Sequence, residues 1–262
     1  MSKLLEGENA IIYGGGGGIG SGVARAFVQE GARVFLVGRT PDRLEAVAKE
    51  ITAAGGLAET AVLDALDERA VDEHVSDVAS KAGSVDVSFN LIKRGDVQGT
   101  PLVEMATADL LRAVVNGLQS NFLTARAAAR RMSEQGSGVI LHLNSASGAG
   151  AMPGMGSTGP ADAATEAFMR YLAAEVGPHG VRVCGIWTAG VVETLSREAL
   201  AEVGGENAPD PQTVEQMIAG MAALRRAPRL ADVAEVAAFL ASDRAAGMTG
   251  TMANVTSGLV LR

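Results

Sequence analysis

The stretch AIIYGGGGGIG, residues 10–20, decides the fold expected for this chain. The apolar residues Ala10–Tyr13 predict a strand, and the glycines that follow lead into a helix that we expect to begin near Ile19. Glycine is needed where a backbone turns sharply toward a pyrophosphate, and the next helix offers free N–H groups to that pyrophosphate. The run fits both G-x-G-x-x-G and G-x-x-x-G-x-G, and its strand–turn–helix context favours a dinucleotide site over a flexible tract. The expected contacts are Gly14, Gly16, Gly18, Ile19 and Gly20.

Outward from this stretch, short apolar runs alternate with helix-period segments. One such segment has apolar residues at Leu44, Val47, Ala48 and Ile51, the spacing of a helix face. The alternation predicts βαβ units, and hence an α/β, Rossmann-like, doubly wound seven-stranded parallel sheet in a single domain over residues 1–262. Residues 191–228, which include VGGENAPDPQ, form the least regular stretch, and we interpret them as a mobile insertion or substrate lid. The expected strands are 10–13, 33–37, 59–63, 85–89, 139–143, 182–187 and 251–255.

Composition limits the partners, the location and the kinds of site expected for this protein. A net charge of −8 argues against a nucleic-acid partner, because nucleic acids attract basic surfaces. No apolar run reaches the roughly 18 residues of a membrane span. The single Cys184 excludes an internal disulfide, so a cytoplasmic location is the simplest expectation. The three histidines lie far apart in the sequence, so no metal site is expected.

The residues after the second expected strand predict the choice of cofactor. An acid at this place binds the adenosine 2′-hydroxyl, whereas a base favours a 2′-phosphate. The chain has Gly38 and Arg39 here and no carboxylate. Because arginine makes charge-assisted bonds to phosphate, we expect NADP(H) rather than NAD, with a solvated Arg39 as the alternative.

These features resemble the short-chain dehydrogenase/reductases over nearly the whole chain. The glycine turn is similar to that family's T-G-x-x-x-G-x-G, with Tyr13 in place of Thr. The resemblance implies that Asp64 contacts adenine and that Asn90 and Thr194 lie at the cofactor. It also identifies Asn116 and Ser145, in LHLNSASG, with the catalytic Asn and Ser of the family.

The chain differs from the family at two of the residues that carry out the family's chemistry. The family's Tyr and Lys correspond to Thr158 and Asp162 here, in STGPADAATEAF, and the chain has no lysine after Lys93. A threonine hydroxyl is a far weaker acid than a phenol, whose pKa is about 10. Asp162 reverses the charge of the lysine, although an ionised carboxylate still accepts hydrogen bonds from ribose hydroxyls. We therefore expect cofactor binding without ordinary Tyr-dependent ketone reduction.

Several interpretations stay open. The chain is an atypical NADP(H)-dependent oxidoreductase acting on an unidentified small molecule, a non-catalytic sensor or partner subunit, or a redox-neutral lyase or isomerase that uses Asp162 with Ser145. Asp162 is either such an acid–base group or a ribose-binding or solvated residue. Lys93 either enters the site or stays in an exposed loop. The resemblance also implies a homotetramer or homodimer formed through the helical segments 110–132 and 158–176.

Overall fold

The computed structural model describes residues 3–261. Seven parallel strands form one sheet in the order β3-β2-β1-β4-β5-β6-β7, which confirms the predicted doubly wound α/β fold. All seven strands lie within about two residues of their predicted positions. The strands are β1 (Asn9–Tyr13), β2 (Arg33–Gly38), β3 (Leu57–Val62), β4 (Val87–Asn90), β5 (Gly138–Ser145), β6 (Val181–Thr188) and β7 (Thr251–Val255).

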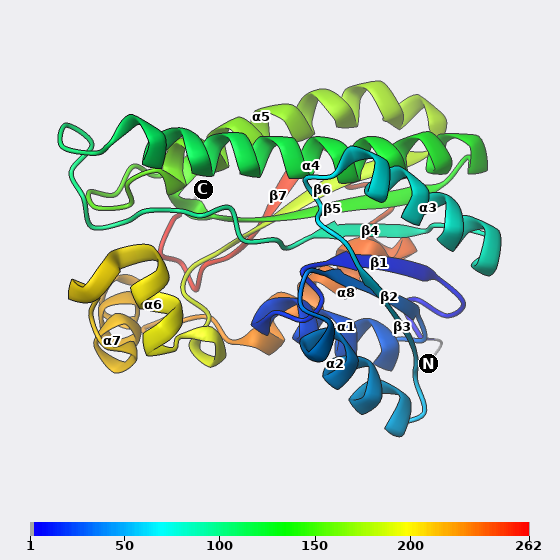
Figure 1. Cartoon of the computed structure of the whole chain (residues 1–262), viewed down its shortest axis with the longest axis horizontal. Helices are drawn as coiled ribbons and strands as arrows, with labels where there is room; N and C mark the ends of the chain where they lie inside the picture. The colour runs from blue at the N-terminus through cyan, green and yellow to red at the C-terminus, as the bar shows by residue number, and fades with distance from the viewer. Residues whose placement is uncertain (1–2, 262) are drawn as a thin grey trace.

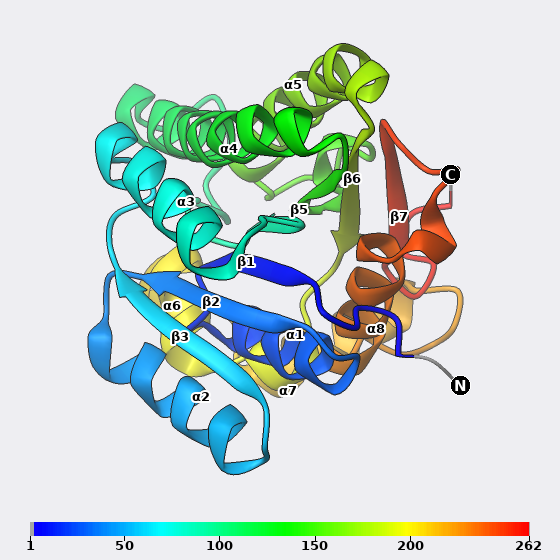
Figure 2. The ribbon, with the colours of Figure 1, turned by 90° about the vertical axis from the view of Figure 1, so that its right-hand side faces the viewer.

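Helices cover both faces of the sheet (Figure 1, Figure 2). On one face lie α1 (Gly18–Gln29), α2 (Pro41–Ala53) and α8 (Leu230–Ala241). On the other lie α3 (Glu68–Ala82), α4 (Thr107–Gln135) and α5 (Thr158–Val176). None of the helices in the described range is long and apolar enough to cross a membrane.

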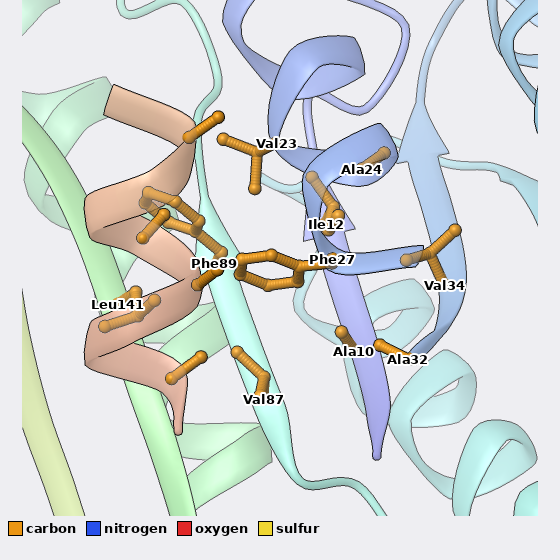
Figure 3. Packing of buried hydrophobic residues seen from close by; sticks show 14 of the residues in the cluster. Ala10, Ile12, Val23, Ala24, Phe27, Ala32, Val34, Val87, Phe89 and Leu141 are labelled. Carbon is orange, nitrogen blue, oxygen red and sulfur yellow. The ribbon is translucent and has the colours of Figure 1, made fainter. Parts of the chain in front are cut away.

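The two faces have separate apolar cores because successive residues of a strand point to opposite sides of the sheet. In β1, Ala10 and Ile12 pack toward α1, where they meet Phe27 and the neighbouring strand residue Phe89 (Figure 3). Ile11 and Tyr13 belong to the core under α3 and α4. Because both faces are covered, β1 is buried along its whole length. This burial explains its uninterrupted apolar sequence.

The segment 191–228 is more regular than its composition indicates. It contains two helices, α6 (Arg197–Gly204) and α7 (Pro211–Met221), which lie apart from the helices that cover the sheet (Figure 1). Local capping explains them. The Ser196 side chain accepts a hydrogen bond from the Ala199 N–H, and the Asp210 side chain accepts one from Thr213 N–H. Pro211 occupies the first turn of α7, where its fixed φ suits a helix.

The strand order defines where a ligand site is expected. The order reverses between β1 and β4, so the loops that follow these two strands diverge and leave a crevice at the carboxyl edge of the sheet. The glycine turn follows β1 and residues 91–98 follow β4. Residues that follow β2 and β3 lie on one side of the glycine turn, and residues that follow β4 lie on the other.

Candidate functional site

The glycine turn is held against the loop that follows β4. Gly14 has a φ of +81°, and a Cβ at this residue would lie 2.6 Å from the Leu91 carbonyl oxygen. The Leu91 N–H in turn donates to the Tyr13 carbonyl at 2.9 Å. A Cβ at Gly20 would lie 2.2 Å from the Gly14 oxygen, so α1 also approaches the turn closely. Only glycine fits these two positions.

The start of α1 can receive an anion. The N-cap Gly17 has no side chain, and no side chain caps the helix. The first backbone N–H to bond back into the helix is that of Ser21, which donates to the Gly17 carbonyl at 2.9 Å. The N–H groups of the first turn are therefore available to a phosphate, and the helix dipole favours negative charge there. Gly18 lies against Thr194, since a Cβ at Gly18 would meet Thr194 Cγ2 at 2.8 Å.

A cavity of about 320 Å³ opens beside the turn. The turn itself contributes Gly14, Gly16 and Gly17 to the wall. On the β2–β3 side the wall includes Arg39, whose side chain is 73% exposed and lies 3.8 Å from Asp64. A second arginine, Arg43 at the start of α2, lies on the same wall. On the β4 side the wall is formed by Lys93, Arg94, Gly95, Asn116 and Glu202.

Other predicted cofactor residues lie beside this wall. Asn90 is buried behind it, where its amide donates to the Thr124 hydroxyl at 3.1 Å and its oxygen accepts from the Ile92 N–H. Asn90 therefore shapes the loop after β4. Within residues 3–261, Gly18, Ile19, Gly20 and Thr194 also do not line the cavity, although they adjoin its glycine turn.

The structure brings together all four predicted catalytic positions. Ser145 ends β5, while Thr158 and Asp162 lie one helical turn apart at the start of α5. The Ser145 hydroxyl donates to Asp162 Oδ2 at 2.5 Å. Asn116 comes from α4 and donates from its amide to the Arg94 carbonyl at 3.1 Å.

The loop after β4 lies across these residues. Arg94 Nη1 donates to Asp162 Oδ1 at 2.7 Å, and Gln98 Nε2 donates to the Thr158 hydroxyl at 3.1 Å. Two hydrogen bonds to Ser157 hold the loop there, because the Val97 N–H donates to Ser157 Oγ at 2.9 Å and the Ser157 N–H donates to the Val97 carbonyl. Residues 94–98 thus contact or adjoin every predicted catalytic position.

Arg94 is held tightly in place. Its side chain is only 13% exposed and contacts Asp96 through Nε at 3.2 Å and Nη2 at 2.8 Å. Its stem packs on α4 at Gly117, where a Cβ would lie 2.6 Å from Arg94 Cδ. Burial acts to lower the pKa of the Arg94 guanidinium, but the carboxylates of Asp162 and Asp96 outweigh it and raise the pKa. Arg94 is therefore a permanent cation on the cavity wall.

Asp162 is the most buried ionisable group of the site, with no exposed side-chain surface. The alternative of a solvated Asp162 is therefore wrong. Burial raises the pKa of its carboxyl to about 6, against the opposing effects of Arg94 and the Ser145 hydrogen bond. At neutral pH the carboxylate is mostly ionised and its oxygens are occupied by Arg94 and Ser145. Because the Asp162 side chain has no exposed surface, an external hydroxyl does not reach it in this arrangement.

Two other ionisable residues, Lys93 and His142, differ in their access to the cavity. Lys93 lines the cavity, but its side chain is 66% exposed and pairs with Glu202 of α6. His142 is buried in β5, and burial lowers the pKa of its imidazole to about 4. No cluster of three metal-ligating side chains occurs within the described part of the chain.

Sequence reasoning missed the polar residues of the loop after β4 and of α6. Arg94 and Gln98 form the links to Asp162 and Thr158, while Glu202 holds Lys93. The only sequence signal was the charged run Lys93–Asp96 in a segment expected near the cofactor. Arg43 was also missed, although it lies four residues after Arg39 across the start of α2.

Comparison with known proteins agrees with this geometry. A family model described as enoyl-(acyl carrier protein) reductase matches residues 15–260. Tropinone reductase-like 2 of Erythroxylum coca is 34% identical over 98% of this chain and 91% of its own length. The structure of a 7α-hydroxysteroid dehydrogenase complexed with NADH and 7-oxo glycochenodeoxycholic acid is 29% identical, with a TM-score of 0.84 and coverage of 98% and 96% of the two chains.

The crystal structure of an NAD⁺-bound xylitol dehydrogenase is also similar. It is 26% identical, has a TM-score of 0.86, and the match covers 97% of this chain and 99% of that one. Both structural neighbours thus share the architecture over essentially its whole length. With a parallel seven-stranded sheet, a glycine turn after β1 and a family match over residues 15–260, the chain belongs to the short-chain dehydrogenase/reductase family.

Proposed function

We propose that this chain binds NADP(H) in the cavity beside the glycine turn and does not reduce ketones by the tyrosine–lysine route of its family. The proposal rests on the position of the Arg94 side chain, which separates the open cavity from the predicted catalytic residues. The cavity is open at the glycine turn, whereas Ser145, Thr158 and Asp162 lie behind Arg94 and off the cavity wall of the described chain.

The cavity suits a dinucleotide. The uncapped start of α1 would bind the pyrophosphate, and Gly14 and Gly20 leave no room for side chains there. Arg39 and Arg43 on the β2–β3 side support a 2′-phosphate, and hence NADP(H) over NAD. The two structural neighbours contain NADH or NAD⁺, which supports a nicotinamide cofactor but not this finer preference. A bound nicotinamide supplies or accepts a hydride.

The protein residues supply little for proton transfer. Asn116 is on the cavity wall, where its amide donates one hydrogen bond to the Arg94 carbonyl, but a neutral amide has no proton to give to a substrate. The Thr158 hydroxyl accepts from Gln98 and is a far poorer acid than a phenol. This arrangement favours a nucleotide-binding member, a sensor or partner subunit, over a carbonyl reductase.

A second candidate is an atypical oxidoreductase, or a redox-neutral lyase or isomerase, that uses Asp162. The specific observation in its favour is a carboxyl with a pKa near 6 that shares a hydrogen bond with Ser145. For this candidate, Arg94 has to move before a substrate reaches Asp162.

The test is a fluorescence titration with NADPH and NADH beside a turnover assay on a panel of ketones and aldehydes. We expect submillimolar NADPH binding without NADPH oxidation. Turnover that is lost in Asp162→Asn supports the second candidate. Failure of both cofactors to bind contradicts the proposal.

A further inference from the structure

Arg94 has a place on the cavity wall that the family resemblance did not assign. We propose that Arg94 is a cofactor-binding residue that donates hydrogen bonds to the ribose hydroxyls of the nicotinamide half of the dinucleotide. This inference rests on the proposed binding of NADP(H). It extends that proposal by giving the half of the ligand beyond the pyrophosphate its own positively charged binding residue.

The strand order indicates which half of the ligand lies near Arg94. Arg39 and Asp64 follow β2 and β3, on one side of the glycine turn, where the adenosine end belongs. Arg94 and Asn116 lie on the β4 side of that turn. A ligand whose pyrophosphate lies at the start of α1 therefore extends its second ribose toward Arg94.

Arg94 also has unused donors. A guanidinium carries five N–H groups. Three are engaged, from Nε and Nη2 to Asp96 and from Nη1 to Asp162. One N–H on each of Nη1 and Nη2 has no other partner within residues 3–261. These two donors, one on each terminal nitrogen, can serve the two hydroxyl oxygens of a ribose.

The guanidinium is fixed before any ligand binds. Asp96 and Asp162 hold it from two directions, and the missing side chain of Gly117 lets its stem lie against α4. A prepositioned donor loses little conformational entropy on binding, which strengthens its bonds to a ligand. The neighbouring cation, Lys93, is 66% exposed on a flexible stem, so it loses more conformational freedom when it binds a ligand. Arg94 is therefore the better-placed donor on this wall.

The test compares two ligands. NADPH contains the nicotinamide ribose, whereas adenosine 2′,5′-bisphosphate ends before it. We expect Arg94→Ala to weaken NADPH binding about tenfold, the effect of losing charge-assisted hydrogen bonds, and to change binding of the bisphosphate less than about twofold. Arg94→Lys should lose most of the same affinity, because lysine lacks the planar pair of donors. Arg69→Ala, which removes an exposed arginine of α3, is the matched control and should change neither affinity.

A second variant guards against misfolding. Arg94→Ala leaves Asp162 buried without its cation, so Gly117→Ala is made in parallel to displace the guanidinium while every charge is kept. It should weaken NADPH selectively. Gly220→Ala in α7, where a Cβ meets nothing within 4 Å, is its control.

The outcomes separate this inference from the proposed function. Unchanged NADPH binding in both Arg94→Ala and Gly117→Ala, or equal losses for the two ligands, overturns the role of Arg94 while leaving NADP(H) binding in place. A wild type that binds neither ligand overturns the proposed function as well. Selective loss of NADPH affinity supports both.

Discussion

Arg94 Nη1 lies 2.7 Å from Oδ1 of Asp162, and the two residues are 68 positions apart in the chain. The pair joins the loop after β4 to the first turns of α5. Where the family resemblance implies a lysine at position 162, this protein has an anion there and brings a cation from another element. The positive charge of the site is thus kept, but its sequence position has changed.

Arg39 is expected to select the cofactor. Arg39→Ala should weaken NADPH binding about tenfold or more, since a lost charged contact to phosphate costs on the order of 1.5–3 kcal/mol. NADH binding should stay nearly unchanged, because NADH has no 2′-phosphate. Fluorescence titration of wild type and variant with both cofactors measures this. Equal wild-type affinity for NADH and NADPH would show that Arg39 has no such role.

Ketone reduction by the wild type should be negligible. General acid catalysis contributes about 10²–10⁴-fold, and neither Thr158 nor the occupied Asp162 supplies it. The absorbance of NADPH at saturating ketone measures the rate. Efficient reduction that survives both Thr158→Val and Asp162→Asn would place the chemistry elsewhere in the molecule.

A designed gain of function tests whether Thr158 and Asp162 occupy the positions of the family's tyrosine and lysine. Thr158→Tyr with Asp162→Lys would restore the family residues, but the new lysine would then face Arg94, so Arg94→Ala is added to remove the like charge. This triple variant should reduce ketones at least tenfold faster than wild type. Replacing its tyrosine with phenylalanine keeps the ring without the hydroxyl and should abolish the gain.

The buried Asp162 should make stability depend on pH. Its carboxyl pKa is raised to about 6 from an ordinary value of 3.8, so the folded state holds this proton more tightly than the unfolded chain does. The associated stabilisation is fully present below about pH 4 and is lost as pH rises through about 6. Relative to Asp162→Asn, the wild-type free energy of unfolding should fall by about 2.4 kcal/mol between pH 4 and pH 7. Urea denaturation of both proteins across this range measures the difference, and a constant or rising difference would contradict it.

The outer face of α4 favours self-association. Leu111, Val115, Leu118 and Phe122 follow a helical spacing and are each at least 36% exposed. Such a continuous apolar stripe is typical of an interface, as is the exposed Tyr171 on α5. We predict a symmetric homo-oligomer, a tetramer or a dimer. Light scattering at micromolar concentration should give a multiple of the 26.7 kDa chain mass. Leu118→Arg should lower that mass while the control Leu224→Arg on another surface does not, and a wild-type monomer would refute the prediction.

Much of the fold could be read from local pattern. The apolar run at Ala10–Tyr13 and the helical spacing of Leu44, Val47 and Ile51 led to the correct elements, because burial on one or two faces leaves a period in the sequence. Local pattern was less informative for α6 and α7. Their N-cap residues, Ser196 and Asp210, lie in a stretch rich in glycine and proline, and this composition predicted an irregular segment instead of helices.

The sequence by itself determined the parallel sheet, the glycine turn and the replacement of the family's tyrosine and lysine by Thr158 and Asp162, because each follows from residue types at fixed local spacing. Only the tertiary structure decided what Asp162 does. Its pKa and its partners depend on burial and on Arg94, a side chain from a loop 68 residues away that no local period predicts. Electrostatic contacts of this kind leave no repeating signal in a sequence, since a charge can be supplied from any element that the fold brings within a few ångströms.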